Sequence, residues 1–250
     1  MIGEAALGLD RLVKTMERLR DPITGCDWDR VQTFATIAPY TIEEAYEVAD
    51  AIARDDMADL ADELGDLQLQ VVFHSQIAAE AGHFCLDDVL AGVCDKLERR
   101  HPHIFGSAVE SPGWEELKAA ERGANADRSA LAGVALALPA LERASKLQKR
   151  AARTGFDWPD ELGPRAKVDE ELAELAEAEP ADRAEELGDL LFAVVNLARH
   201  LKINPEEALR QANRKFERRF RAIETEPGFS TRTLAEMEEL WQAAKVAQSA

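Results

Sequence analysis

The chain has 250 residues and a mass of 27.6 kDa, which suits one large domain or two small ones. Hydrophobic residues make up 46% and charged residues 31%, so the composition excludes a disordered chain. The 48 acidic residues outnumber the 30 Lys and Arg and give a net charge of −18, which argues against nonspecific binding to nucleic acid or to an anionic membrane.

The segment 1–20 carries charged side chains and lacks the hydrophobic region of a signal peptide. The longest apolar run, Leu190 to Val195, is too short to span a bilayer. The cysteines Cys26, Cys85 and Cys94 form no CxxC pair, so we expect neither a disulfide framework nor a structural zinc site. These features predict a cytoplasmic protein without a membrane partner.

The first clear helical pattern lies between Ile42 and Ala49, where apolar residues recur at three- and four-residue steps. Thr41 is followed three residues later by Glu44, as in a capping box, and Pro39 precedes it. The sequence therefore predicts a helix that begins at Thr41. No segment shows the sustained alternation of a strand, so we expect an all-α fold.

Four sequence blocks of the first half return in the same order in the second half. The pairs are Gly25–Trp28 with Gly155–Trp158, Glu43–Glu47 with Glu170–Glu174, Glu63–Leu67 with Glu186–Leu190, and Lys96–Arg100 with Lys215–Arg219. The chain is therefore predicted to contain two homologous helical domains. We place them at 1–124 and 139–250, joined by a linker at 125–138, with Pro139 at the front of the next helical pattern.

Two acidic pairs, each with a spacing of three residues, occur in both halves. They are Glu44/Glu47 with Glu63/Asp66, and Glu171/Glu174 with Glu186/Asp189. On two antiparallel helices such pairs would bring four carboxylates together, and a hard divalent cation such as Mg²⁺ would relieve their repulsion. Gly65 and Gly188, between the acids of the second pairs, suggest a close approach of another backbone. A single pair of this kind would be an ordinary solvated helix face, but the doubled arrangement favours a metal site.

The repeated Lys-x-Glu-Arg-Arg blocks place cations downstream of the acidic pairs, where they could bind a triphosphate. The alternative is a helix end whose cations complement the helix dipole. Trp28, Trp158 and Trp241 could stack on a base or belong to the core. No Gly is followed by Lys, which excludes a Walker-type phosphate loop and leaves the carboxylate–metal route.

The segments Leu67–Phe73 and Leu190–Leu197 are apolar nearly all round. One half has few helices to cover so much apolar surface, so we expect a dimer.

Several runs of the chain closely resemble the MazG family of nucleoside triphosphate pyrophosphohydrolases. They are Leu19–Asp29, Gln32–Glu47, Asp62–Asp66, Lys96–His103 and Asn213–Phe220. The resemblance implies tandem all-α domains that form a four-helix-bundle-like homodimer. It also implies Mg²⁺-dependent hydrolysis of NTPs and dNTPs to the monophosphate and pyrophosphate.

The resemblance further implies a set of site residues, chiefly in the second half. The metal ligands would be Glu171, Glu174, Glu186 and Asp189, with a possible second site at Glu44, Glu47, Glu63 and Asp66. Catalysis would depend on the same four second-half acids together with Lys215 and Arg219. The nucleotide would contact Lys167, Val168, Asp169, Glu170, Glu171, Glu185, Asp189, Lys215, Phe216, Glu217, Arg218, Arg219 and Trp241.

Two other functions are compatible with the same pattern. The chain could be a non-catalytic helical adaptor that binds a basic partner, or a pyrophosphatase specific for dUTP or dCTP.

We expect the second half to perform most of the catalysis, because Asn213 and Arg214 precede Lys215 whereas Asp95 precedes Lys96. A carboxylate at that position would repel a triphosphate.

Overall fold

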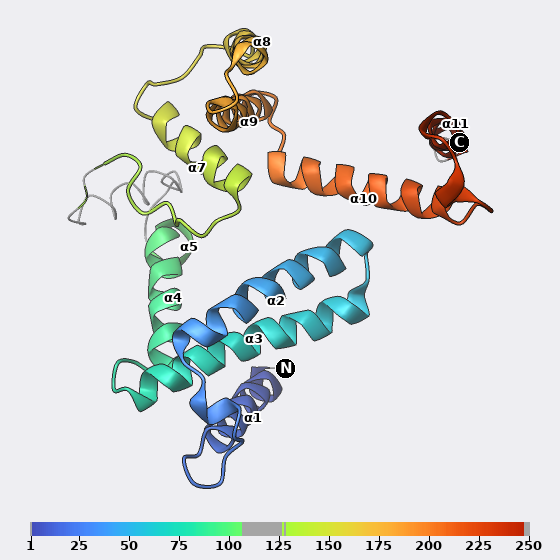
Figure 1. The fold of residues 1–250 in the computed structure, drawn as a ribbon. Helices are drawn as coiled ribbons and strands as arrows, with labels where there is room; N and C mark the ends of the chain where they lie inside the picture. The colour runs from blue at the N-terminus through green and yellow to red at the C-terminus, as the bar shows by residue number, and fades with distance from the viewer. Residues whose placement is uncertain (1, 107–126, 128, 248–250) are drawn as a thin grey trace. The chain divides into compact units, whose positions relative to one another are not determined.

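The structure, a computed structural model, describes residues 2–106, 127 and 129–247 (Figure 1). Every regular element within these residues is a helix, which confirms the predicted all-α class. The chain divides into two units, Met1–Ala120 and Glu121–Ala250. The predicted end of the first domain at 124 lies outside the described residues, and the predicted limits 1–124, 125–138 and 139–250 remain a prediction.

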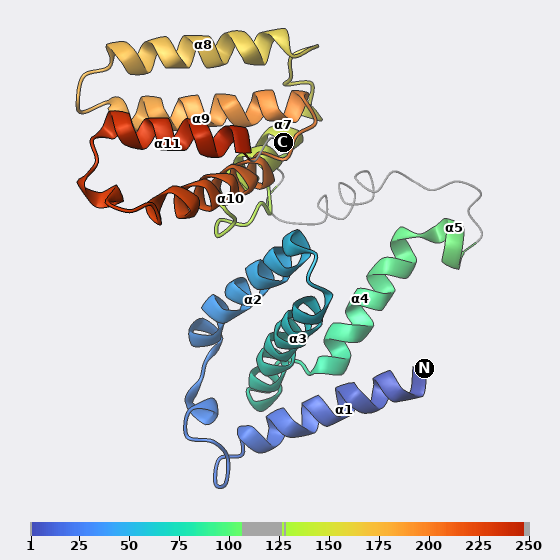
Figure 2. The same ribbon diagram turned by 90° about the vertical axis from the view of Figure 1, so that its right-hand side faces the viewer.

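The first unit is built on an antiparallel pair of helices, α2 and α3, that turn at Asp55 in a left-handed conformation (φ 57°) (Figures 1 and 2). Its elements are α1 (Ile2–Leu19), the 3₁₀ turn η1 (Asp29–Val31), α2 (Phe34–Arg54), α3 (Met57–Glu80), α4 (Leu86–Arg100) and α5 (Pro102–Phe105). α1 packs against α3. The core consists of Met16, Ile37, Val72, Phe73, Ile77 and Leu86.

Helix α2 begins earlier than the sequence predicts. Its N-cap is Thr33, whose hydroxyl accepts from the Thr36 amide while the Thr36 hydroxyl accepts from the Thr33 amide. Thr41, the predicted cap, lies inside the helix, and so does Pro39. The prediction was wrong because the Thr33–Thr36 cap satisfies the first orphan amides, and an internal proline removes only one backbone hydrogen bond.

The second unit repeats the antiparallel helix pair as α8 and α9. Its elements are α7 (Ala140–Ala152), α8 (Leu162–Glu177), α9 (Arg183–His200), α10 (Pro205–Glu224), η2 (Phe229–Thr231) and α11 (Leu234–Ala247). α7 begins directly after Pro139 and packs against α9, while α10 pairs with α11 (Figure 2). Within the described residues, no helix is both long and apolar enough to cross a membrane.

Candidate active site

Three carboxylates from α8 and α9 lie together in the second unit. One oxygen each of Glu171, Glu174 and Glu186 can be chosen so that all lie within 4.8 Å of one another. Glu171 is only 5% exposed, and the ammonium of Lys167 lies 2.6 Å from its carboxylate. A buried carboxylate needs such a counter-charge, because removing an isolated charge from water is costly. The group thus combines a buried acid with a neighbouring cation.

The charges in this group perturb one another. Hydrogen bonds to Glu170 and Glu171 raise the pKa of Lys167 above its ordinary value. Burial, followed by repulsion from Glu171, raises the pKa of Glu174. Repulsion between neighbouring carboxylates favours their protonation. A bound cation would reduce this repulsion and stabilise the ionised carboxylates.

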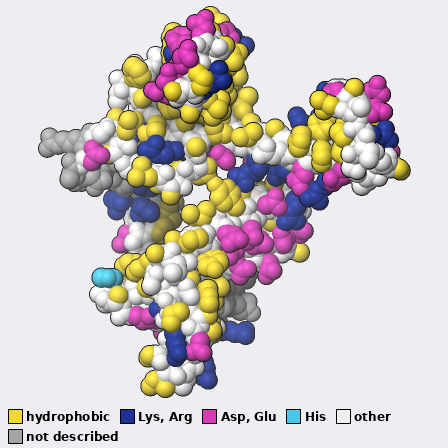
Figure 3. Space-filling view, in the orientation of Figure 1, with side chains coloured by type: hydrophobic (Ala, Val, Ile, Leu, Met, Phe, Trp, Pro, Cys, Tyr) yellow, Lys and Arg dark blue, Asp and Glu magenta, His cyan; other side chains and the backbone are white. Residues whose placement is uncertain are grey.

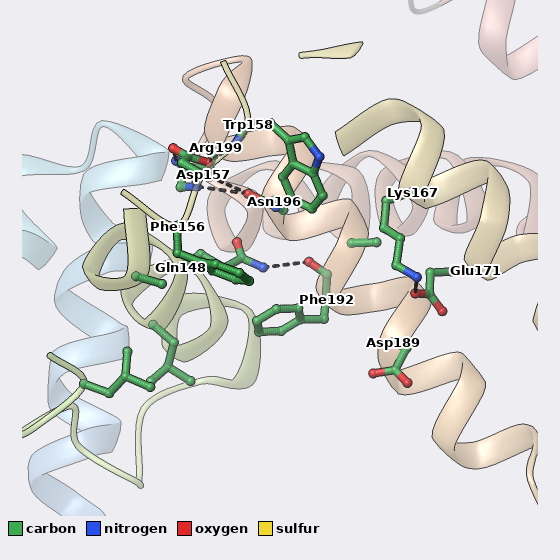
Figure 4. Close-up of a pocket in the computed structure, with 14 residues that line it drawn as sticks. Gln148, Phe156, Asp157, Trp158, Lys167, Glu171, Asp189, Phe192, Asn196 and Arg199 are labelled. Atoms are coloured by element: carbon green, nitrogen blue, oxygen red, sulfur yellow. Dashed lines mark hydrogen bonds and ion pairs between the residues drawn. The ribbon is translucent and has the colours of Figure 1, made fainter. Parts of the chain in front are cut away.

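Asp189, the fourth predicted ligand, lies outside this group of three. It lines the adjoining pocket together with Glu171 and Lys167, and Figure 4 shows these three side chains at one end of that pocket. The structure therefore brings three of the four predicted ligands together and places the fourth on the neighbouring wall.

The first unit also contains a group of three carboxylates on α2 and α3, formed by Glu44, Glu63 and Asp66. Burial is the largest cause of the raised pKa of both Glu44 and Glu63, and the carboxylate of Glu47 contributes to both shifts. Figure 3 shows acidic side chains gathered over α2 and α3. Glu47, the first-unit equivalent of Glu174, lies outside this group, whereas Asp66, the equivalent of Asp189, belongs to it. The two groups therefore share two of their three positions.

Gly65 and Gly188 do not have the role that the sequence suggests. A Cβ atom built on either residue would meet no heavy atom within 4 Å. No other backbone of the described chain approaches them, so the expected close contact was wrong for the single chain.

A pocket of about 490 Å³ in the second unit extends from Lys167, Glu171 and Asp189 to aromatic side chains (Figure 4). The aromatic residues that line it are Phe156, Trp158 and Phe192. This volume lies in the range of small-molecule sites, and an apolar wall with a few polar groups is typical of them. The pocket therefore offers a charged end and an apolar end to one ligand.

Two glycines position the aromatic wall. Gly155 has a φ of 88°, in the left-handed region that favours glycine, and it turns the chain into Phe156. Gly163, in the first turn of α8, lies under Trp158, because a Cβ there would come within 2.0 Å of the indole Cδ1. In the second unit, the Gly-x-Asp-Trp block therefore contributes the backbone turn at its glycine as well as the tryptophan ring.

Two buried amides also line the pocket, and the sequence reasoning missed them. The side-chain nitrogen of Gln148 donates to the Phe192 carbonyl oxygen at 2.8 Å. The side-chain oxygen of Asn196 accepts from the Arg199 guanidinium at 2.7 and 3.1 Å. Asn196 interrupts the apolar run of α9, and this polar residue was the available signal.

The first unit has aromatic side chains at positions equivalent to residues of this pocket. Tyr40 stands three residues before the acidic block, where the second unit has Lys167. Phe73 stands seven residues after Asp66, where the second unit has Asn196. The Trp28 ring contacts both, with centroids 6.1 Å from Tyr40 and 6.4 Å from Phe73. Trp28, 49% exposed, thus contacts two aromatic rings of its own unit, whereas Trp158 lines a pocket.

The predicted cationic block lies on α10 and forms a group with α11. The Trp241 ring lies 5.2 Å from the Phe216 ring, and the Arg219 guanidinium lies 5.9 Å from the centroid of Trp241. Lys215 is exposed, and within the described residues it makes no ion pair with the carboxylates of α8 and α9. The other predicted contacts are Val168, Asp169 and Glu170 on α8, Glu185 in the first turn of α9, and Glu217 and Arg218 on α10.

Helix α9 leaves part of its apolar surface uncovered. Leu187, Leu191 and Val194 are exposed by 47, 49 and 43%. Their spacing of four and three residues places them on one face. In the first unit the residues at the equivalent positions are Leu64, which is 49% exposed, Gln68 and Val71.

The fold and the site define an all-α protein of two repeated helical units, each with a carboxylate group suited to a divalent cation. The family model described as the MazG nucleotide pyrophosphohydrolase domain matches residues 32–105 and 164–223. The chain therefore belongs to the MazG family, and the resemblance seen in the sequence is confirmed.

Two relatives match over almost their whole length. The chain is 52% identical over 255 aligned positions to the nucleoside triphosphate pyrophosphohydrolase of Escherichia coli (strain K12), covering 95% of this chain and 97% of that protein. It is 46% identical, again over 255 positions, to the nucleoside triphosphate pyrophosphohydrolase/pyrophosphatase MazG of Thermotoga maritima, covering 97% of each.

Proposed function

We propose that the chain is a nucleoside triphosphate pyrophosphohydrolase that converts NTPs and dNTPs to the monophosphate and pyrophosphate. Membership of the MazG family and the names of the two relatives support this reaction. The observation that carries the proposal is the carboxylate group of Glu171, Glu174 and Glu186 beside a pocket with an aromatic wall.

The cofactor we propose is Mg²⁺, held by Glu171, Glu174, Glu186 and Asp189. The donor set fits a hard cation, because all four residues offer carboxylate oxygens and three of them already converge. When bound, Mg²⁺ would neutralise phosphate charge and lower the pKa of a coordinated water. The group Glu44, Glu63 and Asp66, with Glu47 nearby, is a possible second site.

In the reaction, a water oxygen forms a bond to the α-phosphorus, and the bond to the bridging oxygen of the pyrophosphate breaks. One carboxylate of the group accepts the proton of the attacking water. Lys167 lies beside the carboxylates and would hold phosphate charge, with Lys215 and Arg219 stabilising the departing pyrophosphate. The remaining nucleotide contacts would be Val168, Asp169, Glu170, Glu185, Phe216, Glu217, Arg218 and Trp241.

We assign the main turnover to the second unit. Both units have an acidic group, but Trp158 lines a pocket beside its carboxylates, whereas the Trp28 ring contacts Tyr40 and Phe73. A nucleotide that bound in the same way in the first unit would compete with these ring contacts. The first unit also has Tyr40 at the position equivalent to Lys167, so it lacks the cation that we propose holds phosphate charge.

The assembly we propose is a homodimer in the cytoplasm, without a nucleic-acid or membrane partner. The exposed face of α9 formed by Leu187, Leu191 and Val194 supports the dimer, since a second copy would cover it. The net charge of −18 supports the absence of a nucleic-acid partner.

The test is a panel of NTPs and dNTPs incubated with Mg²⁺ and analysed for products. We expect monophosphate and pyrophosphate from several bases, and loss of turnover with a chelator. Release of a diphosphate and orthophosphate would overturn the reaction. Turnover of dUTP or dCTP alone would indicate a specialised pyrophosphatase, and no turnover of any nucleotide would indicate an adaptor.

A further inference from the structure

The aromatic end of the second-unit pocket contains a polar pair that the proposed reaction does not use. Gln148 is 6% exposed and Asn196 is 8% exposed, and both line the pocket. Polar side chains this buried normally have their hydrogen bonds satisfied. The side-chain oxygen of Gln148 is buried and has no hydrogen-bond partner.

The orientation of each amide is fixed by its protein partner. The Phe192 carbonyl can only accept, so the Gln148 nitrogen must face it and the Gln148 oxygen must face away. The Arg199 guanidinium can only donate, so the Asn196 oxygen must face it and the Asn196 nitrogen is left to donate elsewhere. Figure 4 shows the Gln148 oxygen turned toward the side where Asn196 and Trp158 lie.

Arg199 is itself held in place. Its guanidinium forms an ion pair with Asp157, which also contacts His200 at 3.0 Å. The Asp157 backbone position is tied to the aromatic wall, because Phe156 and Trp158 flank it in the sequence. The donor at Asn196 is therefore supported by a network and does not depend on one flexible side chain.

We propose that Gln148 and Asn196 form the subsite that reads the hydrogen-bonding edge of the nucleobase, with Gln148 accepting from a base N–H and Asn196 donating to a base acceptor. This inference rests on the proposed function, since it assumes a nucleoside triphosphate with its phosphates at the Glu171 and Asp189 end. Phe156, 82% exposed, and Trp158 offer ring faces that a base would cover.

Gln148 and Asn196 together predict that the site accepts several nucleobases, provided that the base carries an N–H. Adenine, cytosine, guanine and uracil each present an N–H next to an acceptor on the pairing edge, so each can satisfy both amides. A base without any N–H would leave the Gln148 oxygen buried and unpaired. Sites built to bond a substrate N–H discriminate against analogues that lack it.

The experiment compares ATP with the triphosphate of unsubstituted purine riboside, which has the same ring but no N–H. For the wild type we expect kcat/KM to be roughly tenfold or more lower for the analogue. Gln148→Met removes the acceptor at similar length, and we expect it to raise KM for ATP with little change in kcat. In this variant the ratio of kcat/KM for ATP to kcat/KM for the analogue should fall close to one.

Gln70→Met is the matched control. Gln70 is 7% exposed in the first unit and also has a buried side-chain oxygen without a partner, so its removal reproduces the packing change away from the pocket. It should leave the substrate ratio unchanged. Thermal unfolding of both variants identifies any loss of folded protein.

The outcomes separate this inference from the proposed function. Equal kcat/KM for ATP and the purine riboside analogue in the wild type would overturn the inference while the hydrolase assignment stands. A Gln148→Met protein that keeps the wild-type ratio would overturn it as well. Absence of turnover for all nucleotides would instead reject the proposed function.

Discussion

At the residue scale, the two acidic groups allow a paired test of where turnover occurs. Glu174→Gln keeps the side-chain shape but removes a charge from the second-unit group. Removing a proposed metal ligand should cost at least as much as removing an outer-shell partner, so we expect turnover with Mg²⁺ to fall about 100-fold. Glu47→Gln, at the equivalent position of the first unit, should leave most of the activity.

Initial rates of pyrophosphate release at saturating Mg²⁺ measure both variants. Equal losses would mean that the two units share the catalysis, and the opposite ranking would assign it to the first unit. Circular dichroism of both proteins serves as the control for folding.

A second residue-scale prediction concerns Asp157. Hydrogen bonds from Arg199 and His200 hold the pKa of this carboxyl at about 2. A lowered pKa stabilises the folded chain above the unfolded pKa of about 3.9, and this stabilisation is lost as the pH falls toward 2. Asp157→Asn should therefore lower the free energy of unfolding by about 2 kcal/mol at pH 7.

Urea denaturation of the wild type and Asp157→Asn measures this difference. It should stay constant between pH 8 and pH 5, where the wild-type carboxyl is ionised in both states, and shrink below about pH 4. A difference that disappears between pH 8 and pH 5 would show that Asp157 is not held by this ion pair.

The acidic residues could be predicted from the sequence because i,i+3 spacing places two side chains on one helix face. The paired segments in each half then indicated that two helices meet. Gln148 and Asn196 could not be predicted in the same way. Their orientation depends on contacts between α7 and α9 and on Arg199, which no spacing within one helix specifies.

At the scale of helices, Gly163 and Gly188 should respond in opposite ways to alanine. Gly188 lies inside α9 with open space at its Cβ position, so Gly188→Ala should stabilise the unit by up to about 1 kcal/mol. Gly163→Ala would place a methyl group against the Trp158 indole. We expect it to displace Trp158 and weaken nucleotide binding.

Thermal unfolding and tryptophan fluorescence measure these effects, with Trp158→Phe identifying the signal of Trp158. Gly188→Ala should leave that signal unchanged. A loss of stability in Gly188→Ala would show that a ligand or a second copy approaches α9 there. An unchanged Trp158 signal in Gly163→Ala would contradict the predicted contact.

The helices themselves were predictable where periodicity and caps agree, as at α7, which begins after Pro139. The start of α2 could not be predicted in this way, because the segment contains two possible Thr-based N-caps. Thr33 with Thr36 and Thr41 with Glu44 have similar sequence patterns. Only the tertiary structure shows that Pro39 is accommodated within the helix.

At the scale of the whole chain, the two units share a helix hairpin but differ in the side chains around it. The repeated acidic blocks keep a hairpin of helices and a group of three carboxylates in each unit. The difference lies in the residues around the hairpin: Tyr40 and Phe73 add apolar packing, whereas Lys167 and Asn196 add polar groups at a pocket. The two units therefore differ in the side chains beside the carboxylates and not in the helix hairpin itself.

The exposed face of α9 leads to a prediction about assembly. Leu187, Leu191 and Val194 form an apolar row that a soluble monomer would leave in water, so we expect the wild type to have twice the 27.6 kDa chain mass in solution. Leu191→Asp places a charge at the centre of the row and should shift the protein to monomer. Leu136→Asp, at another exposed leucine before α7, is the matched control and should keep the wild-type mass. Light scattering at micromolar concentration measures all three proteins. A wild-type monomer would contradict the dimer, and a dimeric Leu191→Asp protein would place its interface on another surface.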